Sequence, residues 1–304
     1  MRKPSVRRYL VWLLAVYVCV WPWNSVKGAG GSVTSGPGVV EIPVRIAGER
    51  QSMRIYYFKP HRYHADRPVV FVMHGVKRNA GDYLNAWKEL AQLHNLLVVV
   101  PEFSKKQFPG SRSYNLGNVF ARGGALNPAS EWSFTIIDQL FAKFADLFGS
   151  ACSKYSIFGH SAGAQFVHRM ILLSPQSPFD MAIAANAGWY TLPDLNQSWP
   201  YGLHGTSLNE DAVLTPFARK LVVLLGEKDN DPHGKYLNRS RGAMAQGPHR
   251  LARGQNFDAE AKLAAKRLGV SYSWERRTIK SVGHDHRQMA KFAAKIFAPQ
   301  AGCR

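Results

Sequence analysis

A serine lies between two glycines where an apolar run gives way to a helical pattern. The stretch YSIFGHSAG places Ser161 two residues from both Gly159 and Gly163. A sharp strand-to-helix turn would lift the serine hydroxyl above a sheet, and small neighbours leave room for such a turn. The amide of Ala162, at the expected helix start, would then point towards a developing oxyanion. Ser161 is therefore a candidate nucleophile; the alternative is a structural serine in a tight turn.

A serine nucleophile needs a general base, and the base needs an orienting carboxylate. Asp229 follows the apolar run KLVVLLG, and His284 follows the last strand pattern, VSYSWERRTI. The order Ser161, Asp229, His284 is the order expected of this elbow. Asp231 is a competing acid, and His286 is a competing base that falls where the last helix should already have begun. We favour Asp229 and His284. The triplet HDH could belong to a metal site, but no complete ligand set accompanies it, so we expect neither a metal nor an organic cofactor.

The loop after PVVFVMHG should supply the second oxyanion donor, and the Val76 amide is the candidate. His74 is expected to pack beneath this loop and order it. Lys77 and Arg78 are candidate substrate-binding residues for an acidic group, although exposed lysine and arginine side chains often have no such role.

Two long inserts, residues 105–128 and 187–205, are expected to shape the pocket. Trp189 and Tyr190 in the second insert are candidate substrate-binding residues for an acyl or aryl group. The alternative is that these aromatic side chains pack the long loop on itself.

Alternating strand and helix patterns must position these side chains. The apolar strand patterns are short and continuous, which is typical of buried parallel strands, and helical patterns separate them. We therefore expect an α/β fold, with a mostly parallel central sheet covered by helices on both faces. Ligands bind at the carboxyl ends of strands in such sheets. The expected strands are 39–46, 53–58, 68–75, 96–101, 155–158, 180–188, 220–226 and 270–279, and the expected helices are 81–95, 132–148, 162–173, 257–269 and 285–297.

The motifs GHSAG and MHG, with the downstream Asp and His, resemble the α/β-hydrolase superfamily over roughly residues 40–298. The stretch VMHGVKRNAGDYLNAWKELAQLHNLLVVVPE resembles the secreted polyhydroxybutyrate-depolymerase and feruloyl-esterase branch. This resemblance implies that Ser161 is the nucleophile, His284 the base and Asp229 its orienter, with the amides of Val76 and Ala162 as the oxyanion hole. The branch commonly has a cysteine where this chain has Val76, which leaves the substrate class open.

The amino-terminal segment has the pattern of a secretory signal peptide. Basic residues precede an apolar run of 13 residues, from Tyr9 to Trp21, which is short for a membrane span. We expect a cleaved signal peptide over residues 1–28, a Gly/Ser-rich spacer over 29–38 and a single domain over 39–304. This predicts a secreted or periplasmic protein without a stable membrane span after cleavage; an uncleaved anchor is the alternative.

The chain is strongly basic. Its formal charge is +19, and cleavage after residue 28 would leave +14, because five basic and no acidic residues precede that point. Such a charge favours anionic surfaces or substrates, but no nucleic-acid recognition motif is present. Cys152 and Cys303 would remain after cleavage and could form a disulfide bond.

These observations together predict a secreted serine hydrolase that cleaves small-molecule or polymeric carboxylic esters through an acyl-enzyme. A peptidase or an acyltransferase could use the same triad. A basic, non-catalytic binding protein on a hydrolase scaffold is the alternative from another functional class.

Overall fold

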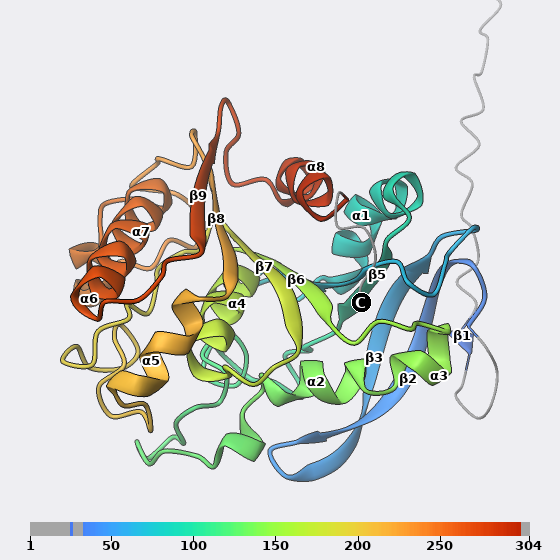
Figure 1. Ribbon diagram of the computed structural model, residues 1–304, viewed down its shortest axis with the longest axis horizontal. Helices are drawn as coiled ribbons and strands as arrows, with labels where there is room; N and C mark the ends of the chain where they lie inside the picture. The colour runs from blue at the N-terminus through green and yellow to red at the C-terminus, as the bar shows by residue number, and fades with distance from the viewer. Residues whose placement is uncertain (1–24, 27–32, 299–304) are drawn as a thin grey trace, which may run out of the picture.

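Nine strands form one sheet in the computed structural model, which describes residues 25–26 and 33–298 (Figure 1). The strand order is β1-β2-β3-β5-β4-β6-β7-β8-β9, and every neighbouring pair from β5 to β9 is parallel. Only the β2–β3 and β3–β5 pairs are antiparallel among these described strands. The strands are β1 (Ser25–Val26), β2 (Gly36–Ile46), β3 (Glu49–Lys59), β4 (Val69–Met73), β5 (Leu97–Pro101), β6 (Tyr155–His160), β7 (Phe179–Ala185), β8 (Lys220–Gly226) and β9 (Trp274–Ile279).

Helices cover both faces of the sheet, which confirms the predicted fold class (Figure 1). Helices α1 and α8 pack on one face, whereas α2, α3, α4 and α7 pack on the other. The helices are α1 (Ala80–His94), α2 (Thr135–Phe141), α3 (Phe144–Phe148), α4 (Ala162–Leu173), α5 (Glu210–Phe217), α6 (Arg241–Ala245), α7 (Arg250–Arg267) and α8 (His286–Phe297), and η1 (Ala129–Glu131) is a 3₁₀ helix.

Strand β4 shows why the central strands are apolar throughout. Val69, Phe71 and Met73 belong to one hydrophobic cluster, and Val70 and Val72 belong to the cluster on the opposite face. Because successive side chains of a strand point to opposite faces, a strand with helices on both sides must be apolar at every position.

Several expected elements have different bounds; the strand predicted over 53–58 begins at Glu49, and the one predicted over 180–188 ends at Ala185. The helix predicted over 132–148 is divided into α2 and α3, and the break lets Phe144 stack on Phe71 with ring centroids 5.2 Å apart. Helix α7 begins at Arg250, upstream of the predicted start, because the His249 ring accepts a hydrogen bond from the Ala252 amide and caps the helix. Strand β9 is shorter than predicted and begins at Trp274.

The predicted spacer is partly ordered sheet. Strand β2 begins at Gly36, not at Val39, and Val33 is buried in the core. A side chain at Gly38 would collide with the Tyr57 ring, so this glycine allows close packing of β2 on β3. The Gly/Ser-rich composition of the segment had indicated a linker instead. The predicted cleavage point after residue 28 lies outside the described residues.

Two further predictions concern the ends of the chain. Across the described residues, no helix combines the length and the apolarity that crossing a membrane requires. Cys152 is disulfide-bonded, and Cys303, its predicted partner, lies outside the described residues.

Candidate active site

Ser161 occupies a strained turn between β6 and α4. Its backbone angles are φ 58° and ψ −115°, a conformation that residues with a side chain rarely adopt. A side chain at Gly159 would collide with the backbone of Gly163, and one at Gly163 would collide with the Met73 carbonyl. Both glycines are therefore required by the close approach of β6, α4 and β4, as the spacing in the sequence predicted.

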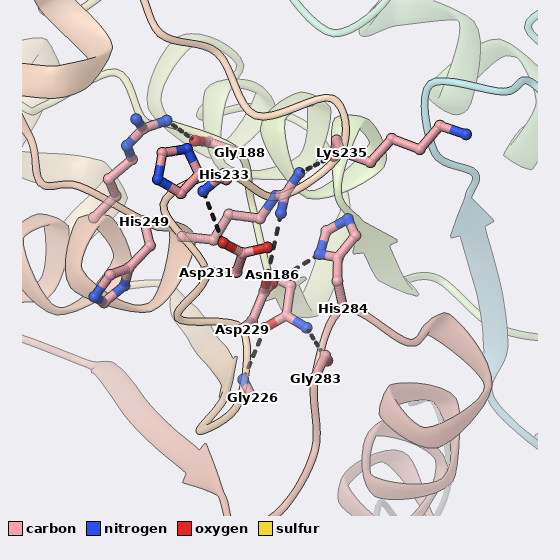
Figure 2. A network of polar contacts seen from close by, with 12 residues as sticks. Asn186, Gly188, Gly226, Asp229, Asp231, His233, Lys235, His249, Gly283 and His284 are labelled. Carbon is pink, nitrogen blue, oxygen red and sulfur yellow. Dashed lines mark hydrogen bonds and ion pairs between the residues drawn. The ribbon is translucent and has the colours of Figure 1, made fainter.

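His284 is hydrogen-bonded to Asp229, with its Nδ1 2.7 Å from Asp229 Oδ2 (Figure 2). The competing acid, Asp231, instead accepts a hydrogen bond from a backbone amide two residues along the chain. The competing base, His286, is the first residue of α8 and stacks on the Tyr83 ring, with centroids 4.3 Å apart. The structure therefore joins the favoured acid to the favoured base.

The second oxygen of the Asp229 carboxylate faces Arg250, the first residue of α7. Arg250 Nη1 lies 3.3 Å from Asp229 Oδ1, and both side chains are buried. The Leu251 amide donates to the Asp229 carbonyl, which places the amino terminus of α7 beside the acid. A buried charged group is tolerated only when it is paired. The contacts with His284 and Arg250 therefore explain how an acid can be buried at this position. A helix amino terminus also favours a nearby anion.

Asn186 connects the loops that carry the acid and the base. Its Oδ1 accepts a hydrogen bond from the Gly226 amide at 2.8 Å, and its Nδ2 donates to the Gly283 carbonyl at 3.0 Å (Figure 2). The side chain is buried at the end of β7. It therefore fixes the ends of β7 and β8 relative to the segment that carries His284.

The loop after β4 lies against the nucleophile turn. A Cβ placed on Gly75 would lie 3.8 Å from the Ser161 Cβ. Val76 follows in this loop, and Ala162 is the first residue of α4. Among the described residues, neither of these two amides has a hydrogen-bond acceptor. Both donors are therefore available beside Ser161.

His74 packs beneath this loop. Its Nε2 accepts a hydrogen bond from the Phe103 amide at 3.1 Å, and its Nδ1 lies 3.2 Å from the Gly75 carbonyl. Complete burial and the nearby Arg78 lower the pKa of His74 to about 3, so the ring is neutral. This is a structural arrangement rather than that of a catalytic base.

Arg78 was a candidate substrate-binding residue, and the structure gives it another role. The side chain is buried, and its guanidinium donates to the carbonyls of Phe103, Phe108 and Gly110. It also lies 4.1 Å from the centroid of the Tyr114 ring. Its hydrogen bonds hold the segment after β5 and leave Lys77 as the exposed cation of this loop.

Trp189 and Tyr190 do not line the cavity beside Ser161. Tyr190 is fully buried and stacks on Phe257 with centroids 4.5 Å apart. Trp189 lies under the guanidinium of Arg169, 4.2 Å from the ring centroid. These aromatic side chains pack the insert onto the domain, which was the alternative interpretation of the sequence.

A cavity of about 400 Å³ contains the three candidate catalytic residues in its lining. Its walls come from the loop after β4, the nucleophile turn, the segment after β8 and the start of α8. Lys77, Lys228 and Lys235 also line it, and none of them has an ion-pair partner among the described residues. The two inserts that were expected to shape the pocket contribute no lining residue. Across the described residues, no group of three or more His, Cys, Asp or Glu side chains could hold a metal ion.

This geometry suits acyl transfer. A strained serine, a histidine with a bonded carboxylate and two free amides are the groups that a covalent acyl mechanism needs. The site also includes residues that the sequence analysis missed. Asn186 could have been noticed as a polar residue that ends the apolar run MAIAAN, whereas no local signal connects Arg250 to Asp229.

Two solved structures decide the family. The chain is 35% identical to poly(aspartic acid) hydrolase-1 from Sphingomonas sp. KT-1, with a TM-score of 0.84 over 87% of this chain and 99% of that one. It is 33% identical to the poly(3-hydroxybutyrate) depolymerase LpqC from Bordetella parapertussis, with a TM-score of 0.82 over 88% of this chain and 92% of that one. The chain belongs to the α/β-hydrolase superfamily. This hydrolase shares the fold alone with the S-formylglutathione hydrolase of Agrobacterium tumefaciens, at 18% identity over 89% of this chain and 98% of that one and a TM-score of 0.58.

Comparisons with protein-family models and with curated proteins gave no match for this hydrolase. The resemblance to the superfamily that the sequence motifs indicated is nevertheless confirmed by the solved structures.

Proposed function

We propose that this hydrolase cleaves carboxylic esters through a serine triad of Ser161, His284 and Asp229. The observation that carries the proposal is the 2.7 Å contact between His284 Nδ1 and the buried Asp229 carboxylate, in the wall of the same cavity as the strained Ser161. The poly(3-hydroxybutyrate) depolymerase among the structural neighbours supports it.

In the proposed reaction, Ser161 Oγ bonds to the acyl carbon and its proton passes to His284 Nε2. The carbonyl oxygen becomes an oxyanion against the amides of Val76 and Ala162. Such donors are worth roughly 3–4 kcal/mol of barrier each. The intermediate expels the alcohol, which takes the proton from His284. A water molecule then attacks the acyl-enzyme while His284 accepts its proton, and the acid leaves as the proton returns to Ser161. Asp229 holds the imidazole in orientation and stabilises its cationic form.

Covalent labelling tests the proposal. A fluorophosphonate probe should modify the full-length protein at one residue, Ser161, and the Ser161→Ala variant should neither react nor hydrolyse p-nitrophenyl esters. Labelling at another residue, or ester turnover that survives Ser161→Ala, would disprove the triad. Absence of both labelling and turnover in the wild type would favour the binding-protein alternative.

A second candidate function is cleavage of an acidic polymer at its amide or ester bonds. The lysines Lys77, Lys228 and Lys235 in the cavity wall favour a substrate with carboxylates, because unpaired cations in a cleft attract anions. A relative of this chain is named a poly(aspartic acid) hydrolase, which also supports this candidate. Such an activity would agree with the peptidase alternative that the triad leaves open.

A substrate panel separates these candidates. Release of short oligomers from poly(aspartic acid), with loss of activity in Ser161→Ala, would establish amide cleavage. Turnover of neutral and carboxylate-bearing p-nitrophenyl esters without polymer cleavage would leave the esterase proposal. Transfer of the acyl group to an added alcohol, in preference to water, would identify an acyltransferase.

We also propose that the protein is exported to the periplasm or secreted, on the basis of the basic and apolar pattern of residues 1–28. Amino-terminal sequencing of the exported protein should begin between Ala29 and Ser32. A membrane-bound form that retains Met1 would instead identify an anchor.

A further inference from the structure

The Tyr83 hydroxyl lies between two segments of the candidate site. Tyr83 is buried in the first turn of α1, and its oxygen is 3.1 Å from His160 Nδ1. The same hydroxyl lies against Gly75 in the loop after β4. A Cβ on Gly75 would lie 2.9 Å from the hydroxyl oxygen, so only a glycine leaves space for this contact.

The hydrogen bond between Tyr83 and His160 requires one donor and one acceptor. Burial raises the pKa of the Tyr83 hydroxyl, so this group keeps its proton. The hydroxyl hydrogen is then free to donate to His160 Nδ1. Burial holds the pKa of His160 well below its usual range, and a neutral ring can accept at this nitrogen.

His160 extends this connection to the candidate base. It is the last residue of β6, immediately before Ser161, and its ring centroid lies 4.5 Å from that of His284. Its Nε2 is buried and has no hydrogen-bond partner among the described residues. A polar nitrogen left unpaired away from water costs stability, so a role in stability alone does not account for a histidine here.

The Tyr83 ring also contacts the start of α8. It stacks on His286, with an interplanar angle of 21°. Tyr83 therefore has its ring fixed by α8 and its hydroxyl fixed by the loop after β4 and by β6. A group with three such attachments is suited to set a distance between segments.

We propose that the Tyr83 hydroxyl and His160 are positioning residues that hold the oxyanion loop against the nucleophile turn. The inference rests on the proposed serine-hydrolase function. Gly75 precedes Val76, and His160 precedes Ser161, so the bridge joins the segment with one oxyanion donor to the segment with the nucleophile and the other donor. Without this bridge, the Val76 amide and the Ser161 hydroxyl would both be present, but the distance between them would be wrong for the reaction.

The Tyr83→Phe variant removes the hydroxyl and keeps the ring. Because an oxyanion donor acts on the transition state, we expect kcat to fall by about tenfold while KM stays unchanged. The affinity for an alkyl trifluoromethyl ketone, whose adduct with Ser161 carries an oxyanion, should fall by a similar factor. Tyr155→Phe is the matched control, since Tyr155 is a buried tyrosine at the opposite end of β6 whose hydroxyl donates to Asp138 at 2.7 Å. It should lower stability without either effect.

A double-mutant cycle tests whether Tyr83 and His160 act together. His160→Leu and Tyr83→Phe remove the same hydrogen bond, so the double variant should lose little more kcat than the more impaired single variant. His160→Asn can present an amide oxygen near the former Nδ1 position, and it should recover part of the activity that His160→Leu loses. Additive losses in the cycle would show that the two side chains are not coupled.

The outcomes separate this inference from the proposed function. If Ser161→Ala is inactive and Tyr83→Phe retains wild-type kcat and inhibitor affinity, the bridge is wrong and the triad stands. If Ser161→Ala remains active, the proposed function itself fails. A fall in activity of Tyr83→Phe that follows only a lower melting temperature, with unchanged kcat per folded molecule, also overturns the bridge.

Discussion

Two carboxylates lie at opposite ends of the parallel sheet, and both have partners on each oxygen. At the carboxyl end, Asp229 contacts His284 at 2.7 Å and Arg250 at 3.3 Å. At the amino end, Asp138 on α2 accepts hydrogen bonds from Tyr155 at 2.7 Å and from Ser177 at 2.8 Å. The local chemistry of the two acids is therefore similar.

The two acids differ in whether the partner side chain is buried or exposed. The Tyr155 ring is buried in the core, so the Asp138 cluster ends in packed side chains. The side chain of His284 is 29% exposed and lines the cavity, and its second ring nitrogen is not used by Asp229. In the proposed triad, the buried carboxylate acts through a partner with another polar atom at the cavity, which the buried partners of Asp138 do not provide.

The largest expected difference between the two ends comes from removing each charge in turn. Asp229→Asn should lower kcat by a factor of up to roughly 10⁴, because the imidazole loses its orientation and its countercharge. Asp138→Asn should keep kcat and lose about 1–3 kcal/mol of unfolding free energy, the cost of disturbing a buried hydrogen-bonded group. Kinetics on p-nitrophenyl esters and urea denaturation of both variants measure this. Asp231→Asn is the control near the site and should retain most activity; a nearly wild-type Asp229→Asn would contradict the assignment.

Arg250 at the carboxyl end of the sheet and Arg219 at the amino end provide a second comparison. Arg250→Lys keeps a charge near Asp229 but loses the planar pair of contacts, so we expect kcat to fall about tenfold. Arg219→Lys at the amino end removes contacts with the carbonyls of Pro175, Ser177 and Phe179. This control should lower the melting temperature and leave kcat unchanged. Equal kcat in both variants would show that Arg250 only stabilises the fold.

Lysines at the two ends test the proposed anionic substrate. The double variant Lys228→Gln/Lys235→Gln should lower kcat/KM for a carboxylate-bearing ester several-fold, with little change for a neutral ester. Lys154→Gln/Lys220→Gln removes the same charge near the starts of β6 and β8 and should change neither value. The difference should shrink as salt increases, because exposed charges are screened. Parallel loss for neutral and acidic esters would argue against recognition of an anion.

The smallest expected effect is the pH dependence of stability at the amino end. Burial raises the pKa of Asp138 above its ordinary 3.8. The folded protein then binds this proton at higher pH than the unfolded chain does, so the contribution to stability is complete below pH 3.8 and is lost as pH rises through the raised pKa. The stability of the wild type relative to Asp138→Asn should therefore increase as pH falls from 7 towards 4. Urea titrations at several pH values measure the difference, and a constant or decreasing difference would contradict this linkage.

The sequence predicted the parts of the site that follow strands directly. Ser161, Asp229 and His284 each come after a strand pattern, and parallel strands bring such positions to one edge of the sheet. Arg250 could not be predicted because it reaches Asp229 from the start of a helix 21 residues along the chain. Its contact depends on how α7 packs, which periodicity does not report.

The cavity lining was harder to predict because burial decides it. Arg78 and Lys77 are adjacent cations in the sequence, but one is buried against carbonyls and the other is exposed. Tyr190 belongs to a long aromatic insert, yet it packs on α7 rather than at the cavity. Residue type signalled a role in each case, whereas the direction of the side chain depended on the tertiary structure.

The contact between Arg250 and Lys235 affects how the rim of the cavity can evolve. Arg250 Nη2 donates to the main-chain carbonyl of Lys235 at 2.7 Å, not to its side chain. Every amino acid carries that carbonyl, so a mutation at position 235 can change the charge or size of the rim while the guanidinium keeps its hold on Asp229. The cavity rim at this position can therefore diverge among descendants of the same gene without an accompanying change in the proposed triad.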